Sequence, residues 1–585
     1  MRGDIKRMKD RVIECKKQFY HKNRLNFILA TISQIAFSII GLAISFLMMI
    51  TIEAIEYQDT KRVWMAGILC ATILVGYVVF GFLQKVYTNR YLKNGLSNFK
   101  NYIFQNILRK SIREYRNSST GQIINAFSND LSSIETNYLS GTVQMIQQIV
   151  IFIIAMCCMF YLNWILALCI LASCVIPMTV SLIFGRNLDV KERKTSDEGE
   201  GFVDQVKDLL SGFTLIKSFQ AEQEVLCLFK EKNISLEEAK RDRRETNDMV
   251  RLASMFSSIL VISMIFIIGL VLAWKGVLTI GAVIAFVELS HYVTTPIEKI
   301  FPLIKNRQAV NALFGKISEA IASKEETTES CVPITGFSQA IEFKNVSFGY
   351  DKEKQVLSNI NLTFQPGKSY ALVGSSGCGK STLTQLLIGY YNDYQGEIDI
   401  DNKLLSTISL DSLYDVISVI SQDVFLFDSS IYNNVMMFKE FDETKVKRAV
   451  KMAGLERLVE EKGMDYACGV GGVNLSGGEK QRVSIARCLL RETPVIIMDE
   501  ATAALDSRTA YEVESAILDI EKVTKIIVTH RYHEDLLRRY DQIFVLRDGK
   551  IVEQGDFDTL MNLKQYFYSL YHVSAGEKQE DFDQL

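Results

Sequence analysis

Nine residues in the second half of the chain have the spacing of a phosphate-binding loop. They read GSSGCGKST and match the pattern G-x-x-x-x-G-K-[ST], directly after the apolar run Tyr370 to Val373 and at the start of a helical run from Ser381 to Ile388. Glycines let backbone amides converge on phosphate oxygens, and the N-terminus of a helix favours negative charge. The sequence therefore predicts a nucleotide site formed by Gly374, Ser375, Ser376, Gly377, Cys378, Gly379, Lys380, Ser381 and Thr382.

Two carboxylates at the end of a later apolar run could complete this chemistry. Val495 to Met498 predicts a buried strand, and Asp499 and Glu500 follow it directly. We expect Lys380 to reach the β- and γ-phosphates of ATP as a catalytic residue, and Ser381 and Asp499 to hold Mg²⁺. Glu500 would polarise the attacking water as the general base. The simpler alternatives are a glycine turn without nucleotide and a solvated strand end.

A third motif lies between these two in the chain. Leu475 to Glu479 reads LSGGE and begins a helical run from Lys480 to Leu490. The three motifs, in this order, resemble those of the ABC transporter family. The resemblance implies that the signature of one cassette covers ATP bound to another cassette, with its helix N-terminus facing the γ-phosphate. It assigns to the nucleotide site Ser476, Gly477, Gly478 and Glu479.

Four further residues match motifs of the same family. Tyr350 resembles the aromatic residue that stacks on adenine, and Gln422 resembles the glutamine that touches Mg²⁺ and relays the nucleotide state. Asp506 resembles part of the loop that contacts the opposite cassette. His530 resembles the histidine that senses the γ-phosphate, and the resemblance implies that it assists catalysis.

Three positions depart from the family pattern. Glu479 replaces the usual glutamine, Ala504 replaces a common serine, and Val470 stands where exporters often have a glutamate. The last difference affects only the detail of coupling between cassette and membrane domain. Since one chain holds one phosphate loop and one signature, the resemblance implies a unit of two chains, either a homodimer or a heterodimer with a related half.

The composition divides the chain into a membrane half and a soluble half. A chain of 585 residues suggests two to four domains, and the 48% of hydrophobic residues are concentrated in the first half. A net charge of −3 argues against a nucleic-acid partner, and eleven cysteines without a C-x-x-C pair argue against a disulfide framework or a zinc site. We expect a membrane domain at 1–322, a linker at 323–340, a cassette at 341–575 and a polar tail at 576–585.

Six apolar runs in the first half are long enough to cross a hydrocarbon layer of about 30 Å. They occupy about residues 25–52, 64–83, 141–162, 164–185, 252–274 and 277–296. Beyond the linker, β-rich runs alternate with helical runs, which is typical of an α/β domain with a largely parallel sheet. The expected fold is an α-helical polytopic membrane domain with six transmembrane helices, as in ABC exporters, followed by an α/β P-loop NTPase cassette. Buried helices of a soluble protein are the alternative for the apolar runs.

The distribution of lysine and arginine predicts the orientation in the membrane. These residues crowd the N-terminal stretch and the long segments 86–140 and 186–250, whereas the three opposite loops are short and nearly free of them. By the positive-inside rule, both termini and the cassette are cytoplasmic in a multi-pass protein of the plasma membrane. Tyr115 to Asp130 and Gly212 to Glu222 resemble intracellular loops of ABC exporters, and the basic N-terminal segment is expected on the inner membrane surface.

A few polar residues and prolines stand out in the spans. Glu288 and His291 lie one helical turn apart in the sixth span, so they share a face. An ionisable group at this depth costs about 2.5–3.5 kcal/mol, so both should face protein or water, and both are candidates for substrate contact. A hydrogen bond between helices is the alternative. Pro177, Pro296 and Pro302 are candidate kink sites.

These features predict an ATP-hydrolysing exporter of an amphipathic compound, such as a drug, a lipid or a peptide, that works by alternating access. An importer on the same fold, as in siderophore uptake, and an ATP-gated channel are the alternatives. An intact Glu500 favours a pump, because gating requires binding more than hydrolysis. The expected cofactors are ATP and Mg²⁺, and the expected partners are a second half-transporter chain, membrane lipid and the substrate, whose identity the fold does not fix.

Overall fold

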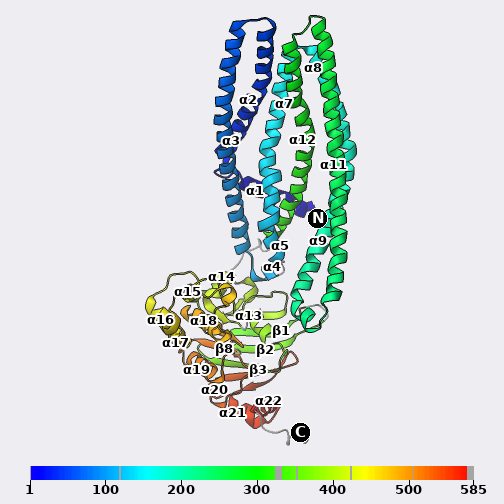
Figure 1. Ribbon diagram of the computed structural model, residues 1–585. Coiled ribbons are helices and arrows are strands. Elements are labelled where there is room, and N and C mark those ends of the chain that lie inside the picture. The colour runs from blue at the N-terminus through cyan, green and yellow to red at the C-terminus, as the bar shows by residue number, and fades with distance from the viewer. Residues whose placement is uncertain are drawn as a thin grey trace. The chain divides into compact units, whose positions relative to one another are not determined.

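The computed structural model describes residues 2–116, 120–322, 332–350, 354–421, 424–502 and 505–575. The chain forms two compact units, Met1–Ser323 and Lys324–Leu585. Figure 1 shows long helices in the first unit and sheets with shorter helices in the second. Some positions singled out in the sequence lie outside the described residues, namely 117–119, 323–331, Gln422, Ala504 and 576–585.

The first unit is a bundle of long helices joined by short helical segments. The main helices are α1 (Arg2–Gln18), α2 (Arg24–Glu56), α3 (Thr60–Leu108), α7 (Gly141–Leu162), the shorter α8 (Trp164–Ser173), α9 (Val175–Ser211), α11 (Glu222–Trp274) and α12 (Ile280–Ala320). The short segments are α4 (Ile112–Arg116), α5 (Thr120–Asn125), α6 (Leu131–Ile134), α10 (Phe213–Ser218) and two π-helical turns, Ala126–Asp130 and Glu135–Ser140.

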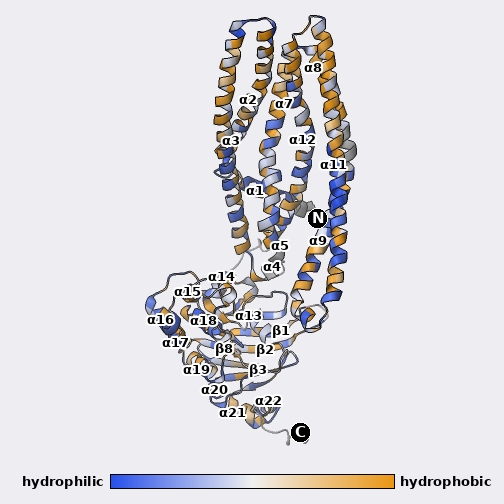
Figure 2. Cartoon of the chain, in the orientation of Figure 1, coloured by the Kyte–Doolittle hydropathy of each residue, from blue (hydrophilic) through white to orange (hydrophobic). Residues whose placement is uncertain are grey.

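Within the described residues, five helical stretches are long and apolar enough to cross a membrane. They are α2, α3, α11, α12 and the run Ile123–Leu162 that ends with α7. Figure 2 shows that apolar residues dominate the upper part of the bundle and that polar residues become more frequent toward its lower end. Because only the hydrocarbon layer requires apolar side chains, this division is typical of helices that cross a membrane and continue beyond it.

Short turns close the hairpins at one end of the bundle. In the turn from α2 to α3, the Asp59 carboxylate accepts a hydrogen bond of 2.9 Å from the amide of Lys61. Asn163 alone separates α7 from α8, and its side-chain oxygen accepts from the amides of Ile165 and Leu166 at 3.1 Å each. Such caps satisfy amides that a helix start leaves without partners. The tight hairpin expected at Asn163 is confirmed.

The fourth predicted span, 164–185, is not one continuous helix. The structure ends α8 at Ser173 and begins α9 after Cys174. Pro177, a candidate kink site in the sequence, has no amide hydrogen to donate to the carbonyl of Ser173 four residues earlier, which accounts for the break. With 10 residues, α8 is shorter than a span, so within the described residues only five of the six expected spans correspond to helices long and apolar enough to cross a membrane.

Glycines lie where α12 packs tightly against neighbouring helices. A Cβ added at Gly281 would lie 2.7 Å from the carbonyl oxygen of Met49 in α2, and one added at Gly269 in α11 would lie 2.7 Å from Cγ1 of Val283. Helices in lipid associate mainly through close packing, which small residues permit. The helix α12 itself continues through both of its prolines.

The second unit contains two β-sheets. An antiparallel sheet has the strand order β2-β1-β4-β5, and a larger sheet has the order β10-β9-β3-β8-β7-β6, parallel from β9 to β6. The strands are β1 (Ile341–Phe348), β2 (Leu357–Phe364), β3 (Ser369–Gly374), β4 (Gln395–Ile400), β5 (Lys403–Leu404), β6 (Ile417–Ile420), β7 (Val495–Asp499), β8 (Thr524–Val528), β9 (Gln542–Arg547) and β10 (Lys550–Gly555). The parallel sheet confirms the expected α/β domain.

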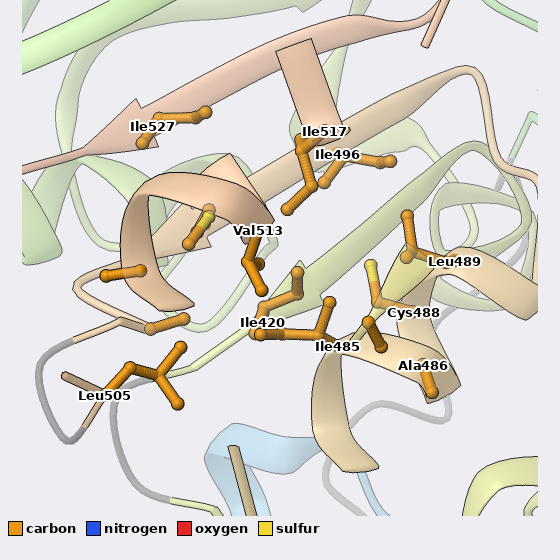
Figure 3. Packing of buried hydrophobic residues seen from close by; sticks show 14 of the residues in the cluster. Ile420, Ile485, Ala486, Cys488, Leu489, Ile496, Leu505, Val513, Ile517 and Ile527 are labelled. Carbon is orange, nitrogen blue, oxygen red and sulfur yellow. The ribbon is translucent and has the colours of Figure 1, made fainter. Parts of the chain in front are cut away.

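Helices flank the larger sheet and bury its apolar strands. They are α13 (Lys380–Leu387), α14 (Leu410–Val416), α15 (Ile431–Met436), α16 (Glu443–Met452), α17 (Glu456–Lys462), α18 (Gly477–Leu490), α19 (Ser507–Leu518), α20 (Glu534–Leu537), α21 (Phe557–Leu563), α22 (Tyr566–Ala575) and two 3₁₀ turns, Leu405–Thr407 and Val470–Gly472. Figure 3 shows side chains of α18 and α19 packed near strand residues Ile420, Ile496 and Ile527. This core fixes the strand ends that carry the polar residues of the site.

Candidate nucleotide-binding site

The phosphate loop follows a strand that is buried along its whole length. All six residues of β3 are buried, and the chain turns at Gly374 into the loop that leads to α13. Gly374 and Gly379 have φ angles of 151° and 107°, which side chains disfavour. A Cβ at Gly374 would lie 2.2 Å from the carbonyl oxygen of Leu546, and one at Gly379 would lie 2.6 Å from Cδ2 of Leu357. Only glycine therefore fits at either end of the loop.

Lys380, the first residue of α13, is 4% exposed. Its ammonium group donates to the carbonyl oxygens of Gly374 and Ser375 at 3.0 Å each, while the three residues before Cys378 are exposed. Burial lowers the pKa of Lys380, although Cys378 and the two carboxylates at the end of β7 oppose the shift. A buried cation held by the loop itself is well placed to bind phosphate oxygens once they approach the exposed residues.

Ser381 and Asp499 meet across the sheet. The hydroxyl of Ser381 donates to Oδ1 of Asp499 at 2.9 Å, which joins the start of α13 to the end of β7. Burial raises the pKa of Asp499, and the hydrogen bond from Ser381 opposes the shift. A hydroxyl and a carboxylate are oxygen ligands of the kind that Mg²⁺ prefers. The two residues predicted as metal ligands are thus brought together, and their donor set fits this ion.

Glu500 and His530 form a second pair, with 2.7 Å between Oε1 of the carboxylate and Nε2 of the ring. Glu500 has a φ angle of 48°, and for a residue with a side chain this left-handed conformation costs on the order of 1–2 kcal/mol. Its amide donates to the carbonyl oxygen of Val528 at 3.2 Å, which ties it to β8. The side chains of Glu500 and His530 are 22% and 38% exposed, so water can reach both. Strain held at a partly exposed carboxylate is typical of a functional position.

Arg531 is a residue that the sequence motifs did not single out. Its Nη2 donates to the carbonyl oxygens of Thr502 at 3.1 Å and Leu505 at 2.8 Å. These carbonyls lie on both sides of residues 503–504, in the loop that follows Glu500. Because the acceptors are backbone atoms, no residue type in the sequence indicates these hydrogen bonds. The only available signal for Arg531 is its position next to His530.

Tyr350 lies beside the last residue of the phosphate loop. Its hydroxyl is 3.0 Å from Oγ1 of Thr382, and its ring packs edge-to-face on Phe348 and Tyr391, with centroids 5.3 and 5.5 Å apart. The side chain is nevertheless 54% exposed. A ring that is fixed at its edge and open to solvent is suited to stacking on a base, as the sequence predicts.

The signature residues form the start of α18. The amide of Ser476 donates to Oε2 of Glu479 at 2.6 Å, and the amide of Glu479 donates to Oγ of Ser476 at 3.3 Å. Oε1 of Glu479 lies 3.5 Å from Nζ of Lys462. Glutamate and glutamine both close such a capping box, so this departure from the family pattern leaves the helix start intact. Ser476 and Gly477 are exposed, and Gly478 is half-buried.

Two other predicted site residues lie nearby in the chain. Asp506 caps α19, because its Oδ1 accepts from the amide of Thr509 at 2.9 Å, and this hydrogen bond lowers the pKa of Asp506. Its predicted contact with an opposite cassette stays a prediction. Gln422, the further predicted Mg²⁺ ligand, lies outside the described residues.

In the helical unit, the structure places Glu288 and His291 on one face of α12. Glu288 is half-buried and His291 is exposed. The opposite stripe of the helix, with Phe286, Leu289 and Val293, is fully buried against its neighbours. The shared face expected from their spacing is confirmed, and their contact with a substrate stays a prediction.

Comparisons with known proteins cover both units of the chain. Residues 6–297 match the family model of the ABC transporter transmembrane region, and residues 357–503 match the family model of the ABC transporter. An ATP-dependent lipid A-core flippase of Desulfotalea psychrophila is 30% identical over 537 residues, which cover 88% of this chain and 91% of that protein.

Two further likenesses agree with these matches. The probable multidrug resistance ABC transporter ATP-binding/permease protein YheH of Bacillus subtilis is 28% identical, and the match covers 90% of this chain and 79% of that protein. The solved structure of a bacterial Atm1-family ABC exporter with ATP bound shares the fold, with a TM-score of 0.82 at 21% identity, over 95% of this chain and 99% of that one. The chain is therefore a member of the ABC transporter family, an exporter-type half-transporter that crosses the membrane several times and couples ATP hydrolysis to transport.

Proposed function

We propose that this half-transporter exports an amphipathic compound, such as a lipid, a drug or a peptide, from the cytoplasmic side of the plasma membrane. Two relatives support this class of substrate, since one is named as a flippase of lipid A-core and the other for multidrug resistance. The ionisable pair Glu288 and His291 lies in the otherwise largely apolar stretch 280–293 of α12 and would suit a compound with polar and apolar parts. The lysine and arginine distribution supports cytoplasmic termini and a cytoplasmic cassette.

In the proposed reaction, Glu500 acts as the general base for the water that attacks the γ-phosphate. His530 holds the carboxylate through their 2.7 Å hydrogen bond and so keeps the base in one orientation. Lys380 and the loop amides bind the phosphates, and Tyr350 stacks on the adenine. The left-handed backbone conformation of Glu500 supports this assignment, because strain of this kind is concentrated at functional positions.

Mg²⁺ would be held by Ser381 and Asp499, with Gln422 as a further ligand implied by the family resemblance. When bound, this ion neutralises phosphate charge and orients the transferred group. The hydrogen bond between Ser381 and Asp499 keeps both ligands together before nucleotide arrives.

A second chain would complete each site. Ser476, Gly477, Gly478 and Glu479 of one chain would cover the ATP held by the other, with Asp506 at the contact between cassettes. The exposed, capped start of α18 supports this role, because the amides at the start of a helix point along its axis. Gly477 and Gly478 carry no side chains that would keep a phosphate group away from these amides. Closure of two cassettes on ATP would turn the membrane cavity outward, and hydrolysis would reset it.

The observation that carries the proposal is the pairing of Glu500 with His530 beside the buried Lys380. Purified protein in inside-out lipid vesicles tests it, with fluorescent lipids and cationic dyes as probes. An exporter accumulates a probe when MgATP is added outside, and Glu500→Gln abolishes accumulation while ATP still binds. Uptake only in right-side-out vesicles loaded with ATP would indicate an importer, and ATP-dependent ion current without accumulation would indicate a channel.

A further inference from the structure

Two cations of the helical unit lie in a cluster of aromatic side chains. Nζ of Lys16 in α1 is 5.7 Å from the ring centroid of Tyr138, and Cζ of Arg307 in α12 is 5.3 Å from the same centroid. Nζ of Lys16 also donates to Oδ1 of Asn311 at 2.7 Å and lies 5.3 Å from the centroid of Phe314. In the part of the chain that the structure describes, neither cation forms an ion pair with a carboxylate.

A buried hydroxyl lies in the same cluster. Tyr91 is 0% exposed, and within the described residues its hydroxyl has no hydrogen-bond partner of normal geometry, although the ring of Tyr20 lies 6.4 Å away between centroids. Tyr20, Tyr138 and Arg307 are all close enough to act on the charge of this hydroxyl. A buried hydroxyl whose contact with Tyr20 falls outside normal hydrogen-bond geometry costs free energy, so this arrangement is incomplete as it stands.

The electrostatics of the cluster favour an anion. Burial lowers the pKa of Lys16, and the positive charge of Arg307 lowers it further. A bound anion would stabilise both charges and supply an acceptor for the hydroxyl of Tyr91. The 3.4 Å contact of Arg307 Nη1 with Oγ1 of Thr142 is a weak alternative partner for a guanidinium.

Helix geometry gives the depth of this cluster. Arg307 lies 27 residues beyond the start of α12 at Ile280, and Tyr91 lies 31 residues beyond the start of α3 at Thr60. At about 1.5 Å per residue they lie about 40 and 46 Å from the end of the bundle that carries the short turns. A bilayer with its headgroups is about 40–45 Å thick, so the cluster lies at the headgroup level of the opposite leaflet. Figure 2 shows α1 crossing the bundle below its most apolar part.

We propose that Lys16, Arg307 and Tyr91 form a binding site for the phosphate group of an anionic membrane lipid. The lipid would fasten α1 to α12, because each helix supplies one cation. This lipid is a resident of the site and is distinct from the transported compound, so the site does not depend on the proposed direction or substrate of transport.

Native mass spectrometry of the full chain tests the proposal, with equal amounts of phosphatidylglycerol and phosphatidylcholine added to the purified protein. The wild type should retain phosphatidylglycerol preferentially. Each of Lys16→Gln and Arg307→Gln should lower this preference by about fivefold, the effect of one cation near a lipid surface. Lys17→Gln removes an exposed lysine of the same helix and should leave the preference unchanged.

Tyr91→Phe controls for misfolding of the other variants, because it removes only the hydroxyl and keeps the buried ring. It should also lower the preference for phosphatidylglycerol. Soluble glycerol phosphate distinguishes the two sources of a phosphate group. If it displaces the bound phosphatidylglycerol completely at equal concentration, the site recognises a free anion and the lipid assignment is overturned. Equal retention of phosphatidylglycerol by the wild type and by the Lys16→Gln, Arg307→Gln double variant would also overturn it.

Discussion

At the scale of single residues, the proposed ATP chemistry is concentrated where β3, β7 and β8 end side by side. Each strand end delivers one polar group to the same place, namely Lys380 after β3, Asp499 at the end of β7 and His530 after β8. Parallel strands produce this convergence, because their carboxyl ends lie at one edge of the sheet. The loops that follow must then be held in position, and Arg531 provides one such support.

Arg531→Gln should slow ATP hydrolysis by about tenfold with little change in the affinity for ATP, because the loop after Glu500 loses two hydrogen bonds that orient it. Turnover number and nucleotide affinity, measured separately on reconstituted protein, check this. Arg538→Gln is the matched control, since Arg538 forms exposed ion pairs with Glu534 and Asp558. An equal loss in both variants would contradict a positioning role.

The buried pair of Glu514 and Tyr540 should make the stability of the wild type depend on pH. Burial raises the pKa of Glu514 above its ordinary value of 4.5, although the 2.6 Å hydrogen bond from the hydroxyl of Tyr540 opposes the shift. Because the pKa of Glu514 is higher in the folded state than in the unfolded state, the contribution of this group to stability is fully present below about pH 4.5. That contribution is lost as the pH rises through the pKa of the folded state.

Glu514→Gln keeps an acceptor for Tyr540 and removes this titration. The unfolding temperature of the variant should therefore rise relative to that of the wild type as the pH is raised from 4.5 to 7. Calorimetry of the full chain in lipid nanodiscs measures the difference. A difference that stays constant over this range would show that Glu514 does not titrate there.

At the scale of elements, the sequence predicts most of the nucleotide site and less of the helix geometry. The pairing of Ser381 with Asp499 was expected because both follow strands in a known order of motifs. The partners of Arg531 could not be found, because they are carbonyl oxygens. Pro177 was a candidate kink site, but the apolar composition of 164–185 does not show that the chain divides there into two helices, α8 and α9. The antiparallel sheet of β1, β2, β4 and β5 was not predicted, because no motif in the sequence indicates it.

The crossing of α2 and α12 gives a prediction at this scale. Gly281→Ala places a methyl group 2.7 Å from the carbonyl oxygen of Met49, and because backbone atoms cannot rotate away, the two helices must separate. We expect a loss of about 1–3 kcal/mol in the free energy of unfolding of the membrane domain. Gly67→Ala in α3 is the control, since a Cβ there meets no atom within 4 Å. Equal unfolding temperatures for the two variants would refute the close crossing.

At the scale of the whole molecule, one chain carries one phosphate loop and one signature, so the proposed unit contains two chains. Lys380→Ala disables the first element and Gly478→Asp the second. Neither variant alone should hydrolyse ATP. In a homodimer, a mixed pair has one site with both changes and one site with neither, so isolated mixed pairs should recover up to about half of wild-type activity.

Co-expression with two different tags, followed by tandem purification, isolates the mixed pairs for this measurement. No recovery in pairs that bind ATP would contradict the composite site. Failure of the wild-type chain to pair with itself would indicate that it requires a different, related half.

The single-residue turn at Asn163 and the short turns at 57–59 and 275–279 limit the methods that can label this end of the bundle. Antibodies, proteases and inserted epitopes all need a length of accessible chain, and the described turns at that end of the bundle offer only a few residues. Labels for that face will have to be single introduced cysteines, while fusion partners belong at the chain ends.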